Sequence, residues 1–347
     1  MAWHGVRVGS PRRLLSMALY TTHAADSGIA TVAPLALIAA ELARVERRIL
    51  ELVCSREQAL EQISSELIGA GGKRVRPALS LLVFRAAGGR DPSDTIEVGA
   101  ALELIHSATL LHDDILDSGQ TRRGRPSPLA RHGLAFTLVA GDFLFSRAFG
   151  VAGRFDEIVV GWATEACIHL CEGEMLQQRF RRNPLVTPDD YREIAARKTA
   201  SLFGQAARIG CHFAGAPPET VEAMRRLGHE LGIAFQIVDD LLDVIGPSEI
   251  IGKPVGSDLR EGSPALPIVL GLRSLPEVAS AFENPSPGPE IVGRALAALR
   301  ASSVLVEVRA CAAEHIGEAR RQLDVLPPSR FRSALADLIE ELLSRTE

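Results

Sequence analysis

Two identical acidic motifs of the form Asp-Asp-x-x-Asp occupy residues 113–117 and 239–243. Each lies in an apolar stretch that we expect to be helical. On a helix, residues i and i+4 share a face, so the first and last carboxylates of each motif point the same way. Like charges this close repel, and burying them is costly unless a cation neutralises them. One motif alone could equally cap a helix or face water, but two matching motifs indicate oxygen ligands for Mg²⁺, an ion that usually shares its shell with substrate phosphates.

Lysine is rare in this chain. Of the 38 basic residues, only Lys73, Lys198 and Lys253 are lysines. In the rest of the chain the basic residues are arginines, which indicates a general replacement of lysine by arginine. An ammonium and a planar guanidinium bind phosphate differently, so a site that needs an ammonium would retain its lysine. Chance placement is the plain alternative. Together with the acidic motifs, these cations indicate a site that binds diphosphates through metal ions on one side and through direct contacts on the other.

The bulk composition favours a helical protein. Apolar residues make up 46% of the 347 residues and aromatic residues only 5%, while the abundant Ala, Leu, Arg and Glu are helix formers. The formal net charge is −5 and no basic stripe interleaved with aromatic residues is present, so we expect no nucleic-acid partner.

The five cysteines, at positions 54, 167, 171, 211 and 311, form no paired framework. This usage fits a reducing compartment, and we therefore expect a cytoplasmic protein. Cys167 and Cys171 lie one helical turn apart and could hold a metal or contact a partner protein. Without a further Cys or His cluster nearby, we interpret them as small buried side chains.

The first 25 residues contain Arg7, Arg12 and Arg13 and no acidic residue. A targeting segment is one interpretation, but the apolar core of a signal peptide is missing, so we expect a flexible extension over residues 1–30. We expect a soluble protein, because no apolar run reaches the roughly 18 residues of a membrane span.

The rest of the chain, residues 31–347, is predicted to be one all-α domain. Helical periodicity recurs with short breaks and without convincing strand alternation. Residues 187–190 and 217–220 have the proline and acidic residues of helix starts. Loops are predicted over residues 118–128, 246–267 and 276–289. Both acidic motifs would therefore end helices and be followed by loops, as at the mouth of a cavity that closes over its ligands.

The chain resembles the trans-isoprenyl diphosphate synthases, the polyprenyl synthetase family, over about residues 40–345. The motifs that carry the resemblance occur in this order: Gly71-Gly72-Lys73-Arg74-Val75-Arg76-Pro77, Glu103-Leu104-Ile105-His106, Asp113-Asp114-x-x-Asp117, Arg122-Arg123-Gly124, Gly141-Asp142, Gly173-Glu174-x-x-Gln177, Lys198-Thr199, Phe235-Gln236-x-x-Asp239-Asp240-x-x-Asp243, Gly252-Lys253-Pro254 and Asp258-Leu259-Arg260-Glu261-Gly262. So many motifs in order are specific, whereas a single Asp-Asp-x-x-Asp would not be.

The resemblance implies an isoprenoid synthase-type helical bundle around a deep central cavity, usually in a homodimer. It implies head-to-tail condensation of an allylic prenyl diphosphate with isopentenyl diphosphate. Membrane contact would be at most peripheral, when an apolar product leaves. The resemblance also implies roles for individual residues. Three Mg²⁺ would be bound by Asp113, Asp117 and Asp239, with Asp114, Asp240 and Asp243 completing the catalytic motifs. The allylic diphosphate would be contacted by Arg122, Lys198, Gln236 and Lys253, with Thr199 beside the reaction centre, and isopentenyl diphosphate would be held by Lys73, Arg76, His106 and Arg123.

The chemistry of such a reaction agrees with these residue types. Cations neutralise a departing diphosphate, and a dry apolar cavity lets a double bond rather than water attack the allylic cation. His106 precedes Asp113 by two helical turns and so lies on the same face. A buried histidine bonded to the backbone is the alternative interpretation of His106.

One departure from the family pattern is Ser263, where many relatives carry a second lysine. One cation fewer on the allylic diphosphate predicts weaker binding or slower ionisation.

Small residues one turn before the first acidic motif bear on product length. In the family, bulky aromatic residues at these positions stop elongation early, and here the positions hold Ala108 and Thr109. The sequence therefore predicts an all-trans product of about thirty to fifty carbons. A deeper floor residue such as Phe143 or Phe145 would instead give a geranylgeranyl diphosphate synthase.

Two rival functions share parts of this pattern. A class I terpene cyclase also uses acidic metal motifs, but usually with a different second motif and without the Lys73, Arg76 and His106 set. A non-catalytic subunit of a heteromeric synthase typically loses acidic residues, whereas this chain retains all six.

Overall fold

The structure is a computed structural model that describes residues 34–72, 74–122, 124–246 and 255–344. Lys73, Arg123, Lys253 and the predicted extension over residues 1–30 lie outside the described residues. Within the described ranges the regular secondary structure is helical, apart from one antiparallel pair of two-residue strands. The predicted all-α fold is confirmed.

The first half of the chain contains the helices of one side of the bundle and the two short strands. They are η2 (Pro34–Ile38), α1 (Ala39–Leu52), α2 (Gln58–Gly69), α3 (Val75–Ala86), α4 (Ser93–Leu116), β1 (Thr121–Arg122), β2 (Arg125–Pro126), α5 (Pro128–Ala152) and α6 (Glu157–Phe180). The second half consists of α7 (Pro188–Ala195), η3 (Ala196–Ala200), α8 (Ser201–Phe213), α9 (Pro218–Ile245), α11 (Ser257–Glu261), α12 (Leu266–Gly271), α13 (Pro276–Glu283), α14 (Pro289–Ala301), α15 (Val304–Arg321), η4 (Gln322–Val325) and α16 (Arg330–Ser344).

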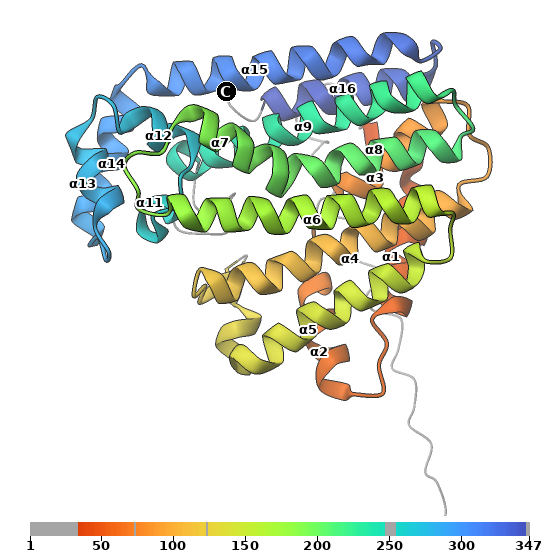
Figure 1. The fold of residues 1–347 in the computed structure, drawn as a ribbon, viewed down its shortest axis with the longest axis horizontal. Coiled ribbons are helices and arrows are strands. Elements are labelled where there is room, and N and C mark those ends of the chain that lie inside the picture. The colour runs from red at the N-terminus through yellow and green to blue at the C-terminus, as the bar shows by residue number, and fades with distance from the viewer. Residues whose placement is uncertain (1–33, 73, 123, 247–254, 345–347) are drawn as a thin grey trace, which may run out of the picture.

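The long helices lie roughly side by side, and the short helices α11 to α14 gather at one end of the bundle (Figure 1). α4 packs against α3 and α5, and α9 packs against α8 and α15. Their contacts enclose one hydrophobic core, whose largest fully buried side chains include Phe203 and Phe282. The two helices that carry the acidic motifs, α4 and α9, are therefore fixed by packing along most of their length.

Local sequence signals explain where several helices begin. The Thr187 hydroxyl accepts a hydrogen bond from the Asp190 backbone N–H at 3.1 Å, and the Asp190 carboxylate accepts one from the Thr187 N–H at 2.9 Å. This reciprocal capping box starts α7. Pro218 occupies the first turn of α9, where its missing N–H has no cost.

The predicted loops need correction at three places. Residues 118–128 contain the strand pair, in which Thr121 lies opposite Pro126 and Arg122 opposite Arg125. The segment 246–267 contains α11, and the segment 276–289 contains α13. Prolines and glycines in these segments were interpreted as loop signals, although a proline in the first turn is equally compatible with a helix start.

α5 has an unusual distribution of apolar residues. It bends at Gly133, whose φ of +78° is a left-handed conformation that glycine adopts without strain. Beyond the bend, Leu134, Phe136 and Val139 are all more than half exposed. Among the described residues, α5 is the one helix that length and composition alone would allow to cross a membrane, with 33% of its most apolar window buried. Asp142 and Arg147 interrupt the apolar residues of this helix, so α5 contains no uninterrupted apolar run of about 18 residues.

Candidate active site

A cavity of about 390 Å³ opens between α4, α7, η3, α9 and α11. Both acidic motifs contribute to its wall. The predicted site residues among its lining are Arg76, His106, Thr109, Asp113, Asp117, Arg122, Lys198, Thr199, Gln236, Asp239, Asp240, Asp243 and Ser263. Of the described predicted residues, Asp114 and Ala108 do not line the cavity.

Lys198 and Thr199 are presented by η3, a π-helical turn that widens the helix between α7 and α8. Two glycines allow neighbouring helices to approach this turn closely. A Cβ on Gly173 of α6 would lie 2.5 Å from the Lys198 backbone nitrogen, and one on Gly232 of α9 would lie 2.5 Å from the Ala200 Cα. Because π-turns are rare and recur at functional sites, η3 marks this position independently of the motifs.

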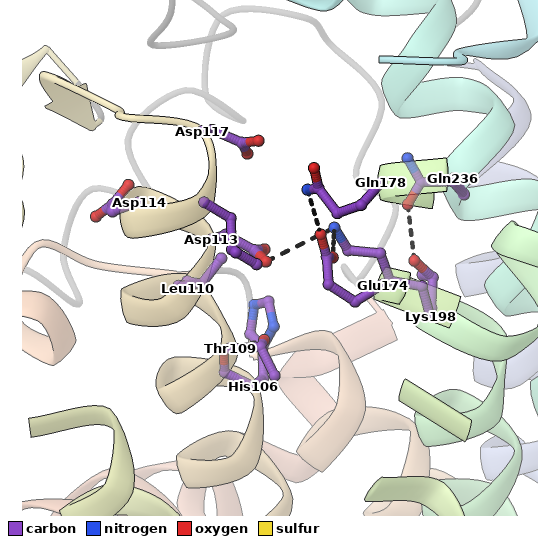
Figure 2. A network of polar contacts seen from close by, with 12 residues as sticks. His106, Thr109, Leu110, Asp113, Asp114, Asp117, Glu174, Gln178, Lys198 and Gln236 are labelled. Carbon is purple, nitrogen blue, oxygen red and sulfur yellow. Dashed lines mark hydrogen bonds and ion pairs between the residues drawn. The ribbon is translucent and has the colours of Figure 1, made fainter. Parts of the chain in front are cut away.

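Lys198 is held between two carboxylates from different helices (Figure 2). Its ammonium lies 2.5 Å from the Glu174 carboxylate of α6 and 3.6 Å from that of Asp113. Gln178 donates a hydrogen bond to the other Glu174 oxygen at 2.8 Å. Burial alone would lower the pKa of Lys198, but the carboxylates of Asp113 and Glu174 raise it, so Lys198 stays charged. Burial raises the pKa of Asp113, and the Lys198 ammonium partly offsets this effect.

A second network fixes the middle of the other acidic motif. The Thr199 hydroxyl donates to the Gln236 amide oxygen, and the Gln236 amide nitrogen donates to Asp240, both at 2.8 Å. The Leu266 N–H donates to the second Asp240 oxygen at 3.1 Å. Burial raises the pKa of Asp240 to about 7. Nearby, the buried Tyr191 hydroxyl has no hydrogen-bond partner of standard geometry among the described residues, and burial raises its pKa.

Asp243 has a different role from its motif neighbours. One carboxylate oxygen accepts hydrogen bonds from the Ser257 N–H at 3.1 Å and the Ser257 hydroxyl at 2.7 Å, and the other accepts from the Asp258 N–H at 3.1 Å. These donors form the N-terminus of α11, where a carboxylate is favourable. Asp243 therefore caps α11 and holds this helix beside the cavity.

The first acidic motif also has arginine partners. Asp114 is buried and pairs with Arg122, whose Nη2 lies 2.7 Å from the carboxylate. Arg122 thereby remains oriented along the cavity wall. Asp117, just after the end of α4, lies 3.2 Å from Nη1 of Arg181.

Arg76 and His106 lie on the cavity wall. The Arg76 guanidinium stacks 4.6 Å from the centre of the Phe203 ring, and burial lowers its pKa to about 10. Thr109 lines the cavity and donates to the His106 carbonyl at 2.8 Å, whereas Ala108 is fully buried in the core.

Three residues near the site received no role from the sequence. Glu174 belongs to a recognised motif, but the spacing of that motif does not show that Glu174 reaches Lys198. Arg181 follows the end of α6, and Tyr191 belongs to the apolar face of α7. No local pattern distinguishes Arg181 and Tyr191 from ordinary surface and core side chains.

The donor set fits a hard divalent cation. Asp113, Asp117 and Asp239 offer only oxygen atoms toward one cavity. Among the described residues, no three Asp, Glu, His or Cys side chains are grouped closely enough to hold an ion by themselves. Ions at this site would therefore complete their coordination with water or with phosphate oxygens of a ligand.

Comparisons with known proteins agree with this arrangement. The polyprenyl synthetase family profile matches residues 57–292. The chain is 38% identical over 300 residues to a short chain isoprenyl diphosphate synthase of Methanothermobacter thermautotrophicus, covering 83% of this chain and 91% of the relative. It is 36% identical over 315 residues to octaprenyl diphosphate synthase of Escherichia coli, covering 89% and 97%. The crystal structure of a polyprenyl synthase from Caulobacter crescentus complexed with calcium and isoprenyl diphosphate is similar, with a TM-score of 0.86, 34% identity, and coverage of 90% and 97%.

Proposed function

The chain belongs to the polyprenyl synthetase family and is a trans-prenyltransferase, and from this premise we propose that it condenses an allylic prenyl diphosphate with isopentenyl diphosphate, head to tail. The observation that carries this proposal is the convergence of both acidic motifs and Lys198 on one cavity with an apolar wall. Few other chemistries require two acidic clusters and an ammonium around a space large enough for a hydrocarbon chain.

We assign the allylic diphosphate to the space between the two acidic motifs. Asp113, Asp117 and Asp239 would hold Mg²⁺, three ions in our proposal, which when bound would neutralise the departing diphosphate. Lys198 contributes a fixed positive charge beside the same group, because Glu174 keeps the ammonium in place.

The other residues of this pocket have orienting roles in the proposal. Gln236 and Thr199 form one hydrogen-bonded unit with Asp240, so they present their polar atoms in a fixed orientation. Leu170, Leu202 and Phe235 supply an apolar wall that excludes water from the allylic cation. The released diphosphate can accept the final proton, so the proposal requires no protein base.

We assign isopentenyl diphosphate to the region of Arg76 and His106. Arg76 offers a half-buried guanidinium for a phosphate, and the stacked Phe203 ring restricts its orientation. Lys73 and Arg123 complete this set in the proposal and lie outside the described residues.

We propose a long product of about thirty to fifty carbons. The small Thr109 on the cavity wall supports this proposal, and Ala108 is the second position that we assign to chain length. The two relatives described above are named for short-chain and octaprenyl products, so family membership alone is compatible with both lengths.

We also propose a cytoplasmic homodimer. The exposed apolar side chains of α5 support a protein partner for this face, since contiguous exposed apolar surface commonly marks an interface. The five free cysteines support a reducing compartment. Membrane contact would be limited to release of an apolar product.

The test is an incubation of the purified chain with Mg²⁺, labelled isopentenyl diphosphate and farnesyl diphosphate, followed by dephosphorylation and sizing of the products. A ladder of products ending at thirty or more carbons would support the full proposal. A single twenty-carbon product would retain the reaction and reject the long-chain assignment. Absence of condensation with every allylic starter would favour a non-catalytic subunit.

A further inference from the structure

Arg181 connects the first acidic motif to α11, the helix that Asp243 of the second motif caps. Its Nη1 lies 3.2 Å from the Asp117 carboxylate, and its Nε donates to the Glu261 carbonyl at the end of α11 at 2.7 Å. Further hydrogen bonds of 3.3 Å reach the Leu116 carbonyl and the Gln178 side-chain oxygen. Since Asp243 caps the other end of α11, Arg181 closes a chain of contacts from the second motif to the first.

The neighbouring Arg182 anchors the same helix, and within the described part of the chain it contacts no acidic side chain. Its backbone N–H donates to the Gly262 carbonyl at 2.9 Å, and its guanidinium donates to the Arg260 carbonyl at 2.5 Å and to the Phe282 carbonyl at 3.2 Å. It also donates to the Asn284 carbonyl. Arg181 and Arg182 therefore share the task of holding α11, and only Arg181 also places its charge on a proposed metal ligand.

Lys198 and Arg181, two of the cations that contact the first acidic motif, differ in how their charges are paired. Lys198 has a second carboxylate, Glu174, so its charge remains balanced when Asp113 binds another cation. Among the described residues, Asp117 is the one carboxylate within 4.0 Å of the Arg181 guanidinium, and the other three partners are neutral oxygens. These neutral contacts would keep Arg181 near Asp117 after a metal ion has bound there.

We propose that Arg181 is a positioning residue that neutralises Asp117 in the metal-free site and lowers the affinity of this site for divalent ions. The proposal rests on the proposed function, because it takes Asp117 as a metal ligand. A cation entering beside Asp117 must break the ion pair and then remain close to the guanidinium charge. Metal would therefore bind weakly to the free protein and more firmly once a diphosphate contributes its own negative charges.

The experiment measures Mn²⁺ binding to the substrate-free protein by the electron paramagnetic resonance signal of free Mn²⁺. Arg181→Gln is expected to bind Mn²⁺ about tenfold more tightly than wild type, which corresponds to about 1.4 kcal/mol. Arg182→Gln is the matched control. It loosens α11 through the same helix end and should leave Mn²⁺ affinity within about twofold of wild type. Thermal unfolding of both variants records the loss of anchoring.

Each outcome has a defined meaning. Unchanged or weaker Mn²⁺ binding by Arg181→Gln would overturn the proposal. An equal increase of Mn²⁺ affinity in Arg182→Gln would also overturn it, because the effect would then come from the loss of α11 contacts. If Arg181→Gln does not fold, Arg181→Lys replaces it. This variant keeps the charge, and an affinity tenfold above wild type would contradict the proposal. If wild type itself binds no Mn²⁺, with or without inorganic diphosphate, the proposed function fails rather than this inference.

Discussion

Replacing Asp243 with Asn should separate a structural role from a metal-binding role within the second acidic motif. The Asp243 carboxylate accepts three hydrogen bonds from the first residues of α11, and this helix lines the cavity with Ser257, Asp258 and Glu261. Asn retains the shape of the side chain and removes its charge. We therefore expect the variant to weaken the attachment of α11 without removing a metal ligand.

The size of the effect follows from the three contacts of Asp243. An Asn oxygen can keep the two bonds from Ser257, but the amide nitrogen then faces the Asp258 N–H, so one bond is lost and two donors oppose each other. The two remaining bonds also lose their charge assistance. With roughly 1.5–3 kcal/mol for a bond to a charged group and about 1 kcal/mol for a neutral one, the attachment of α11 should weaken by about 4 kcal/mol.

The assay is hydrogen exchange measured by mass spectrometry on peptides covering residues 255–262. A loss of about 4 kcal/mol would raise local opening by up to about a thousandfold. Asp239→Asn is the comparison, and it should weaken Mn²⁺ binding while leaving exchange in this segment within about twofold. The reasoning is refuted if Asp243→Asn leaves the exchange unchanged and abolishes Mn²⁺ binding as Asp239→Asn does, since Asp243 would then be a metal ligand.

Three other predictions concern product length, substrate affinity and pH. Thr109→Phe should shorten the product, because a five-carbon unit excluded from the cavity forfeits about 4 kcal/mol of burial; an unchanged product profile would reject Thr109 as part of the floor. Ser263→Lys should lower the KM for the allylic substrate about tenfold by adding a charged contact, and an equal KM in both proteins would contradict this. The close polar contact of His229 at 3.7 Å and the hydrogen bond with His315 at 2.7 Å lower the pKa of Glu230 from 4.5 to about 2. Because this folded-state pKa is depressed, Glu230 stabilises the fold above its unfolded pKa, and its contribution disappears as the pH falls from about 4.5 toward 2. Glu230→Gln should thus reduce the free energy of unfolding in urea at pH 7 by up to about 3 kcal/mol, and a deficit that stays constant down to pH 3 would disprove the assignment.

Local signals in the sequence were sufficient for the long helices that carry the acidic motifs and for the start of α7, but not for the short helices α11 and α13. The capping residues Thr187 and Asp190 predicted the start of α7, and the apolar stretches around both motifs predicted α4 and α9. The spacing of i and i+4 also placed Asp113 and Asp117 on one cavity wall. These features depend on neighbours within one or two helical turns, and the sequence contains that information directly.

The pairings across the cavity could not be predicted in this way. The contacts of Glu174 with Lys198 and of Arg181 with Asp117 join helices that are distant in the chain, and no periodicity relates them. The cap on α11 is similar, because the motif spacing places Asp243 on the same helix face as Asp239 but does not show that its carboxylate binds Ser257. Such contacts depend on how helices pack, and this is a property of the whole core.

The π-helical turn η3 has a consequence for how this protein can change under selection. Such a turn contains one residue more than an α-helical turn and has less favourable hydrogen bonding, so deletion of a single residue within Ala196–Ala200 would give a regular and more stable helix. The same deletion would rotate part of this segment by about 100° and turn Lys198 or Thr199 away from the cavity. Selection for thermostability alone would therefore favour loss of the turn, and its persistence in a lineage is expected only while the activity is also under selection.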